Sequence, residues 1–80
     1  MINKIFTSPE VNKYLEKHNL IQYFKKSVQK LKNEQNTGLD FKKREPKSLN
    51  IWSFRITKKY RAWCKRENDI LKIYLIDDHQ

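Results

Sequence analysis

Apolar residues between positions 7 and 35 recur every three or four residues, the spacing of one face of an α-helix. A first helix is predicted to start at the string TSPE, with the Thr7 hydroxyl as cap and Glu10 three residues later. Asn19 is suited to end it in a left-handed conformation. Its apolar face is formed by Val11, Tyr14, Leu15 and His18. His18 is therefore interpreted as a core-edge or helix C-terminal histidine.

The same spacing continues and predicts a second helix over residues 21–35, with Gly38 ending the segment. Its apolar stripe consists of Leu20, Phe24, Val28 and Leu31. Its outer face carries Lys25, Lys26, Lys30 and Lys32. Because only a few residues separate the two helices, they are expected to form a helical hairpin.

From Leu39 onward the hydrophobic period changes to two, which is typical of β-strands. Three β-rich runs are predicted over residues 51–57, 60–66 and 70–76, separated by short hairpin turns. Residues 2–6 suit a short edge strand, and residues 39–43 a weak strand or extended arm. The order β-α-α-β-β-β predicts one α+β domain over residues 1–80, with two helices packed on an antiparallel sheet of about four strands.

Strand alternation indicates which side chains leave the core. Trp52 and Phe54 alternate with Arg55, and Ala62 alternates with Arg61, so both arginines are expected on the face away from the helices. Trp63 shares that side. The run 70–76 is apolar nearly throughout, which favours a central strand that delivers Asp77, Asp78 and His79 to the rim of the sheet.

Charge narrows the class of partner. Lys and Arg total 18 against 9 Asp and Glu, and the net charge of +9 favours a polyanion such as nucleic acid, an acidic protein or an anionic membrane surface. No apolar run approaches the roughly 20 residues that a membrane-spanning helix needs, and MINKIFTSPE lacks the apolar region of a signal peptide, so a cytoplasmic location is expected. Cys64 and two histidines make no zinc-type cluster, and neither metal nor cofactor is expected.

The string IWSFRITKKYRA, followed by a second hairpin and a last strand ending IDDHQ, resembles the RelE/ParE superfamily of bacterial toxins. The RelE- and YoeB-like branch is the most similar. FTSPEVNKYL is similar to that family's first strand and helix entry, and GLDFKK to the basic segment before its sheet. The resemblance implies a RelE-like fold and the toxin of a type II toxin–antitoxin pair, an endoribonuclease that cleaves mRNA on the ribosome and is neutralised by an antitoxin.

The resemblance also implies site residues. Arg61 matches the arginine that contacts the scissile phosphate, Arg55 a basic residue of the preceding strand, and His79 the histidine that transfers a proton. The general base of YoeB-like members corresponds to Glu45 or to Asp40, depending on where a gap is placed. The chain departs from the pattern at Gln80, where YoeB-like toxins have an aromatic residue.

RNA cleavage without a metal requires a base for the 2'-hydroxyl, cations beside the phosphorane and an acid for the 5'-oxygen. Arginine suits the second role because its planar guanidinium holds two phosphate oxygens. The alternative interpretation of Arg55 and Arg61 is that they lie on a solvated face of the sheet and pair with acidic residues. Trp63 is suited to stack on a base, to cover the sheet or to contact an antitoxin. The expected RNA-binding residues are Lys42, Lys43, Arg44, Lys47, Lys58, Lys59, Tyr60 and Trp63.

Two other functions fit the same residues. A ParE-like toxin would inhibit DNA gyrase by protein contact and would need no catalytic side chain. A binding module that has kept the fold and lost the reaction would contact RNA or protein only. Fold alone does not distinguish these three functions.

Overall fold

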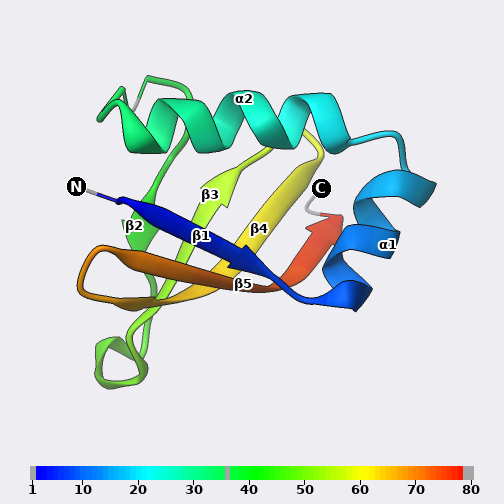
Figure 1. Cartoon of the computed structure of the whole chain (residues 1–80). Coiled ribbons are helices and arrows are strands. Elements are labelled where there is room, and N and C mark those ends of the chain that lie inside the picture. Colours follow the sequence, from blue (N-terminus) through cyan, green and yellow to red (C-terminus); the bar gives the residue numbers. More distant parts are fainter. Residues whose placement is uncertain (1, 36, 79–80) are drawn as a thin grey trace.

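A computed structural model describes residues 2–35 and 37–78 of the chain. Two helices, α1 (Pro9–Lys17) and α2 (Ile21–Lys32), accompany one β-sheet and a short 3-10 turn, Lys47–Leu49. The strands are β1 (Lys4–Thr7), β2 (Lys42–Lys43), β3 (Ile51–Arg55), β4 (Tyr60–Glu67) and β5 (Ile70–Asp78). α2 runs along the sheet, whereas α1 packs against β5 near one end of it (Figure 1). The predicted α+β class and the three hairpin-connected strands are confirmed.

The sheet has five strands in the order β1-β5-β4-β3-β2, and it is mixed rather than wholly antiparallel. β1 lies parallel to β5, with Ile5 beside Leu71, and the Asn3 amide donates to the Asp69 carbonyl at 2.7 Å. The expectation of about four antiparallel strands missed this pairing, because it joins segments at opposite ends of the chain. β4 is the middle strand, and β5 lies between β4 and β1.

The helix ends differ slightly from the expected ones. Ser8, not Thr7, caps α1, because its side-chain oxygen accepts a hydrogen bond from the Val11 amide at 3.2 Å. Asn19 has the predicted left-handed conformation, with φ of 57°. α2 ends at Lys32, about one turn before position 35, because Leu31 is the last helical residue buried in the core.

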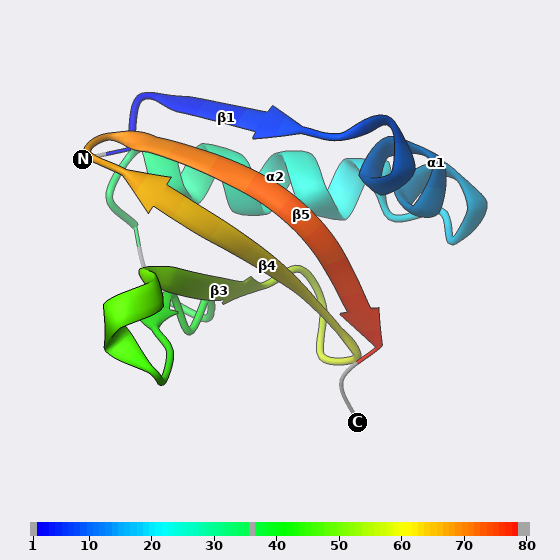
Figure 2. The ribbon, with the colours of Figure 1, turned by 90° about the horizontal axis from the view of Figure 1, so that it is seen from below.

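The core lies between the helices and one face of the sheet. Phe24 of α2 packs on Phe54 of β3 with ring centroids 6.1 Å apart, and the Ser27 hydroxyl donates to the Arg55 carbonyl at 3.1 Å. Ala62 lies opposite Phe54 across the β3–β4 hairpin and is fully buried. The other face, here called the open face, carries no helix, and the sheet crosses in front of α2 in Figure 2. Neither helix among the described residues is long and apolar enough to cross a membrane.

A β-bulge in β5 changes what the open face displays. Trp63 is opposite Leu75, but the next residue, Cys64, is opposite Ile73, so Tyr74 has no partner in β4. Tyr74 and Leu75 are consequently both exposed, at 45% and 49%. Simple alternation of the apolar run would have buried one of them.

Candidate functional site

Arg55 and Arg61 lie directly opposite each other across the β3–β4 hairpin. Opposed residues of an antiparallel pair project from the same face of the sheet. Because the preceding pair, Phe54 and Ala62, faces the helices, the two arginines face away from them. The structure therefore brings together the two arginines that the sequence analysis placed on one face.

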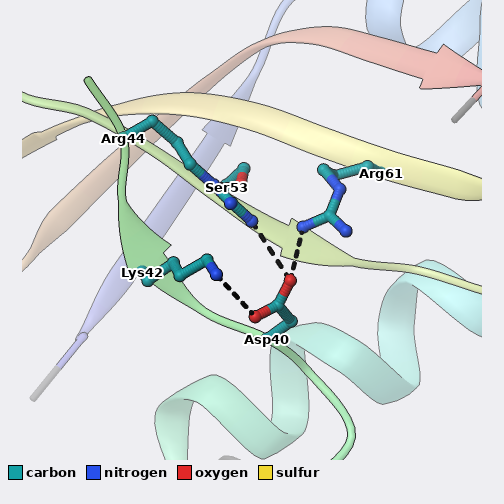
Figure 3. Close-up of polar contacts among 5 residues, drawn as sticks. All are labelled: Asp40, Lys42, Arg44, Ser53 and Arg61. Atoms are coloured by element: carbon teal, nitrogen blue, oxygen red, sulfur yellow. Dashed lines mark hydrogen bonds and ion pairs between the residues drawn. The ribbon is translucent and has the colours of Figure 1, made fainter. Parts of the chain in front are cut away.

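Asp40 lies against the guanidinium group of Arg61 (Figure 3). Its Oδ2 accepts a hydrogen bond from Arg61 Nη1 at 2.9 Å and another from Arg44 Nη2 at 3.2 Å. Its second oxygen, Oδ1, is 3.5 Å from Lys42 Nζ. One carboxylate thus contacts three cations, and we call Asp40, Lys42, Arg44 and Arg61 the Asp40 cluster.

The cluster changes the acidity of its carboxylate. The hydrogen bond from Arg61 is the main cause that lowers the pKa of Asp40 from 3.8 to about 2, with further contributions from the Arg44 hydrogen bond and the Lys42 charge. These effects outweigh desolvation, which acts in the opposite direction. Asp40 is therefore an anion at neutral pH and a weak base.

Asp40 lies in the segment between α2 and β2, and this segment positions it beside Arg61. Leu39 is 2% exposed in the core, and its carbonyl accepts the Arg55 amide at 2.6 Å. Asp40 itself has φ of 50°, a left-handed conformation that Asp and Asn tolerate better than most residues. No local sequence pattern indicates this pairing, because Asp40 and Arg61 are 21 positions apart.

Arg44 connects the cluster to the middle of the open face. Its Nε donates to the hydroxyl of Ser53, which is fully buried, and its guanidinium carbon lies 5.9 Å from the ring centroid of Trp63. Trp63 is opposite Ser53 and so shares the face of Arg61, as expected. The Trp63 Nε1 is buried and has no hydrogen-bond acceptor among the described residues.

The other predicted basic residues surround this centre unevenly. Lys42 is opposite Ser53, whereas Lys43 is opposite Trp52 and therefore projects from the other side of β2. Lys47 lies in the 3-10 turn before β3, and Lys58 and Lys59 lie in the turn after it. Lys42 and Lys43 thus lie beside the middle of β3, whereas Lys58 and Lys59 follow its end. All of these lysines are exposed.

Glu45 and Tyr60 are not brought to Arg61. Glu45 is exposed beyond β2, and no hydrogen bond or ion pair among the described residues joins it to the Asp40 cluster. Tyr60 projects toward α1, where its hydroxyl lies 3.4 Å from His18 Nδ1 and its ring is 6.2 Å from that of Tyr14. His18 is the C-cap residue of α1, as its interpretation from the sequence anticipated.

His79 lies outside the described residues, and the proton-transfer role that the resemblance implies for it stays a prediction. The last described strand, β5, ends at Asp78. Asp77 is opposite Arg61, and Asp78 is opposite Tyr60, with its carboxylate 3.6 Å from Lys59 Nζ.

The open face also carries exposed apolar side chains, which lie among charged residues such as Lys65 and Lys72. Phe6 of β1 is 52% exposed and lies beside Lys72 in β5. With Tyr74 and Leu75 it forms an exposed group, here called the apolar patch, beside the half-buried Trp63. The sequence analysis did not identify this patch, since it depends on the parallel pairing of β1 and on the bulge in β5.

This arrangement of two helices and a five-stranded mixed sheet is similar to that of two solved structures. The chain superposes over its whole length on the YoeB dimer from Staphylococcus aureus, with a TM-score of 0.71, 16% identity and all of that chain covered. It superposes equally completely on the YoeB–YefM complex from Staphylococcus aureus, with a TM-score of 0.68, 20% identity and 99% of that chain covered.

At the level of sequence, the chain matches no protein-family model and no curated protein. The likeness to YoeB is therefore a likeness of fold. Any common activity has to be argued from the residues on the open face.

Proposed function

We propose that this chain is the toxin of a type II toxin–antitoxin pair and that it cleaves mRNA in the cytoplasm without a metal ion. The observation that carries the proposal is the opposed pair Arg55 and Arg61 on the helix-free face of a YoeB-like fold. Two arginines at opposed positions on one face of the sheet suit a phosphate that gains charge during reaction.

In the proposed reaction, Glu45 takes the proton of an RNA 2'-hydroxyl, and the 2'-oxygen attacks the adjacent phosphorus. Arg61 and Arg55 stabilise the charge that develops on the phosphorane oxygens. His79 gives a proton to the departing 5'-oxygen. The products are a 2',3'-cyclic phosphate and a free 5'-hydroxyl, so atoms and charge balance with no further reactant.

RNA binding is assigned to the basic residues around this centre. Lysines that project beyond the sheet contact several phosphates and hold the strand without reading its sequence. Trp63 is suited to contact a base, because its ring lies on the same face and is partly exposed. The assigned residues are Lys42, Lys43, Arg44, Lys47, Lys58, Lys59, Tyr60 and Trp63, of which Lys43 projects from the other side of β2 and Tyr60 faces α1.

Two macromolecular partners accompany this activity. An antitoxin with an acidic binding segment would complement the charge of +9 and cover the apolar patch at the same time. The likeness to a YoeB chain in complex with YefM supports such a partner. The ribosome, with mRNA in place, is the proposed site of cleavage.

Primer extension on cellular mRNA after brief induction tests the proposal. The wild-type chain is expected to arrest growth and to produce cuts at defined codon positions. Arg61→Gln should remove the cuts, because the phosphorane loses its nearest buried cation. Arg66→Gln is the matched control: it removes the same charge from the same strand, but Arg66 stacks on Trp52, 4.8 Å from the ring centroid, rather than joining the Asp40 cluster.

The alternatives predict different outcomes. Growth arrest without new mRNA ends, undiminished in Arg61→Gln, would contradict the ribonuclease and favour a toxin that acts by protein contact. Absence of both arrest and cuts in the wild type would favour a binding module. Relief of arrest by the product of a neighbouring gene would support the antitoxin.

A further inference from the structure

We propose that Asp40 is a positioning residue, whose carboxylate holds the guanidinium groups of Arg61 and Arg44 together for one RNA phosphate and does not accept the substrate proton. The inference deepens the proposed ribonuclease function and rests on it for its kinetic consequence. It also separates two residues, Asp40 and Glu45, between which the resemblance left the general base undecided.

The geometry of the shared oxygen is the first support. Arg61 and Arg44 both donate to Oδ2 of Asp40, at 2.9 and 3.2 Å. Two guanidinium groups this close repel each other, and the repulsion is strong where water is partly excluded. The Arg61 side chain is 9% exposed and that of Arg44 23%, so water screens them poorly. A bridging anion is what allows both cations to remain at one place.

The attachment of Asp40 is the second support. Its neighbour Leu39 is anchored twice, by a side chain in the core and by the Arg55 amide on its carbonyl. The same hydrogen bond joins the Asp40 segment to the strand residue opposite Arg61. Asp40 is thus fixed relative to both arginines of the proposed centre, as a residue that orients others needs to be.

The occupation of the carboxylate argues against a role as base. Oδ2 already accepts two charged hydrogen bonds, and Oδ1 faces the Lys42 ammonium group. A proton acceptor needs a free lone pair directed at the substrate hydroxyl and an affinity for the proton near neutral pH. The pKa of about 2 shows that this carboxylate has little such affinity. Glu45 is exposed and makes none of these contacts, and it stays the base of the proposed function.

Asp40→Asn is the informative variant, because Asn keeps the shape of the side chain and tolerates the left-handed backbone. It removes the negative charge between the two arginines. Glu67→Gln is the matched control: it removes the same charge from an exposed ion pair, 3.1 Å from Lys72, at the far end of the open face. Both proteins are compared with wild type in three measurements.

The first measurement is the dissociation constant for a non-cleavable RNA with a 2'-deoxy nucleotide at the reactive position. The second is the single-turnover cleavage rate of the matching RNA, with ribosomes where they are required, as a function of pH. The third is the NMR spectrum of the arginine Nε–Hε groups. For Asp40→Asn we expect RNA binding as tight as in wild type or tighter, a cleavage rate lower by about tenfold or more, an unchanged shape of the pH–rate profile, and displaced or broadened Arg61 and Arg44 signals.

Results that differ from these expectations would each contradict a particular part of the proposal. Wild-type cleavage by Asp40→Asn, or a rate lost in proportion to binding, would overturn the positioning role. Loss of the acidic limb of the pH–rate profile would identify Asp40 as the base instead. A wild-type protein that cleaves no RNA would overturn the proposed function and the kinetic role with it. Unchanged arginine signals in Asp40→Asn would still overturn the structural statement by themselves.

Discussion

Arg55 and Arg61 occupy opposed positions of one hairpin, yet Arg55 is exposed and Arg61 is 7% exposed. The difference arises from Asp40 and Arg44, which cover Arg61 and leave Arg55 in water. Replacing either arginine by Gln removes one charge from the same face. Arg61→Gln also leaves Asp40 with fewer donors, and we expect it to lower the free energy of unfolding by about 2 kcal/mol. Arg55→Gln should change it by no more than about 0.5 kcal/mol.

Urea unfolding monitored by tryptophan fluorescence measures both values. Equal destabilisation by the two substitutions would mean that the Asp40–Arg61 pair adds nothing to the stability of the fold. A smaller loss of unfolding free energy for Arg61→Gln than for Arg55→Gln would contradict the finding that Arg61 is the more buried of the two.

The relationship of these two arginines was predictable from the sequence, since alternation and a short turn are local properties. Residues 51–55 and 60–67 contain the hairpin, and apolar residues at every second position specify which face is buried. The exposure of each arginine was not predictable in the same way. It depends on Asp40, which reaches Arg61 through the end of α2, the anchoring of Leu39 and the pairing of β2 with β3.

The acid sensitivity of the Asp40 cluster follows from its lowered pKa. A carboxylate whose pKa is depressed in the folded state stabilises that state fully above its unfolded value, and the contribution disappears as the pH falls through the folded value. For Asp40 the pKa is 3.8 in the unfolded state and about 2 in the folded state. The difference in unfolding free energy between wild type and Asp40→Asn should therefore be largest above about pH 4 and shrink toward pH 2. Urea titrations at a series of pH values measure it.

A difference that stays constant over this pH range would mean that the Asp40 carboxylate is not held by Arg61 in solution. A difference that grows as the pH falls would have the wrong sign for a depressed pKa. Low salt is the appropriate condition, because the carboxylate is 33% exposed and its ion pairs are partly screened.

The apolar patch illustrates what the sequence could not show. Phe6 reaches the open face because β1 pairs with β5 in parallel, a contact between residues 66 positions apart. Tyr74 and Leu75 are both exposed because the bulge in β5 shifts the alternation by one residue. Neither feature has a local signal in an apolar run such as ILKIYLI, for which burial on both faces was the simplest interpretation.

Cys64 should be unreactive while the chain is folded. It is fully buried in β4, and burial raises the pKa of its thiol to about 12. Thiol reagents attack the thiolate, which is scarce for such a group at pH 8 and inaccessible as well. We expect no reaction with a disulfide reagent on the minute scale in native buffer and complete reaction in guanidinium chloride. Fast reaction in native buffer would show that β4 and β5 open locally far more often than global unfolding allows.

The final prediction concerns how RNA binding depends on salt. Each phosphate contact with single-stranded RNA adds about 0.7 to the slope of log K against log salt concentration. Lys42 is exposed on the open face beside Arg44 and Arg61, whereas Lys30 is exposed on α2, on the other side of the sheet. If RNA follows the open face, Lys42→Gln should reduce the slope by about 0.7 and Lys30→Gln should leave it unchanged. Fluorescence anisotropy with a labelled non-cleavable RNA over a range of salt concentrations measures the slopes. The reverse result, with the loss at Lys30, would place the RNA on the helical side and remove Arg55 and Arg61 from its path.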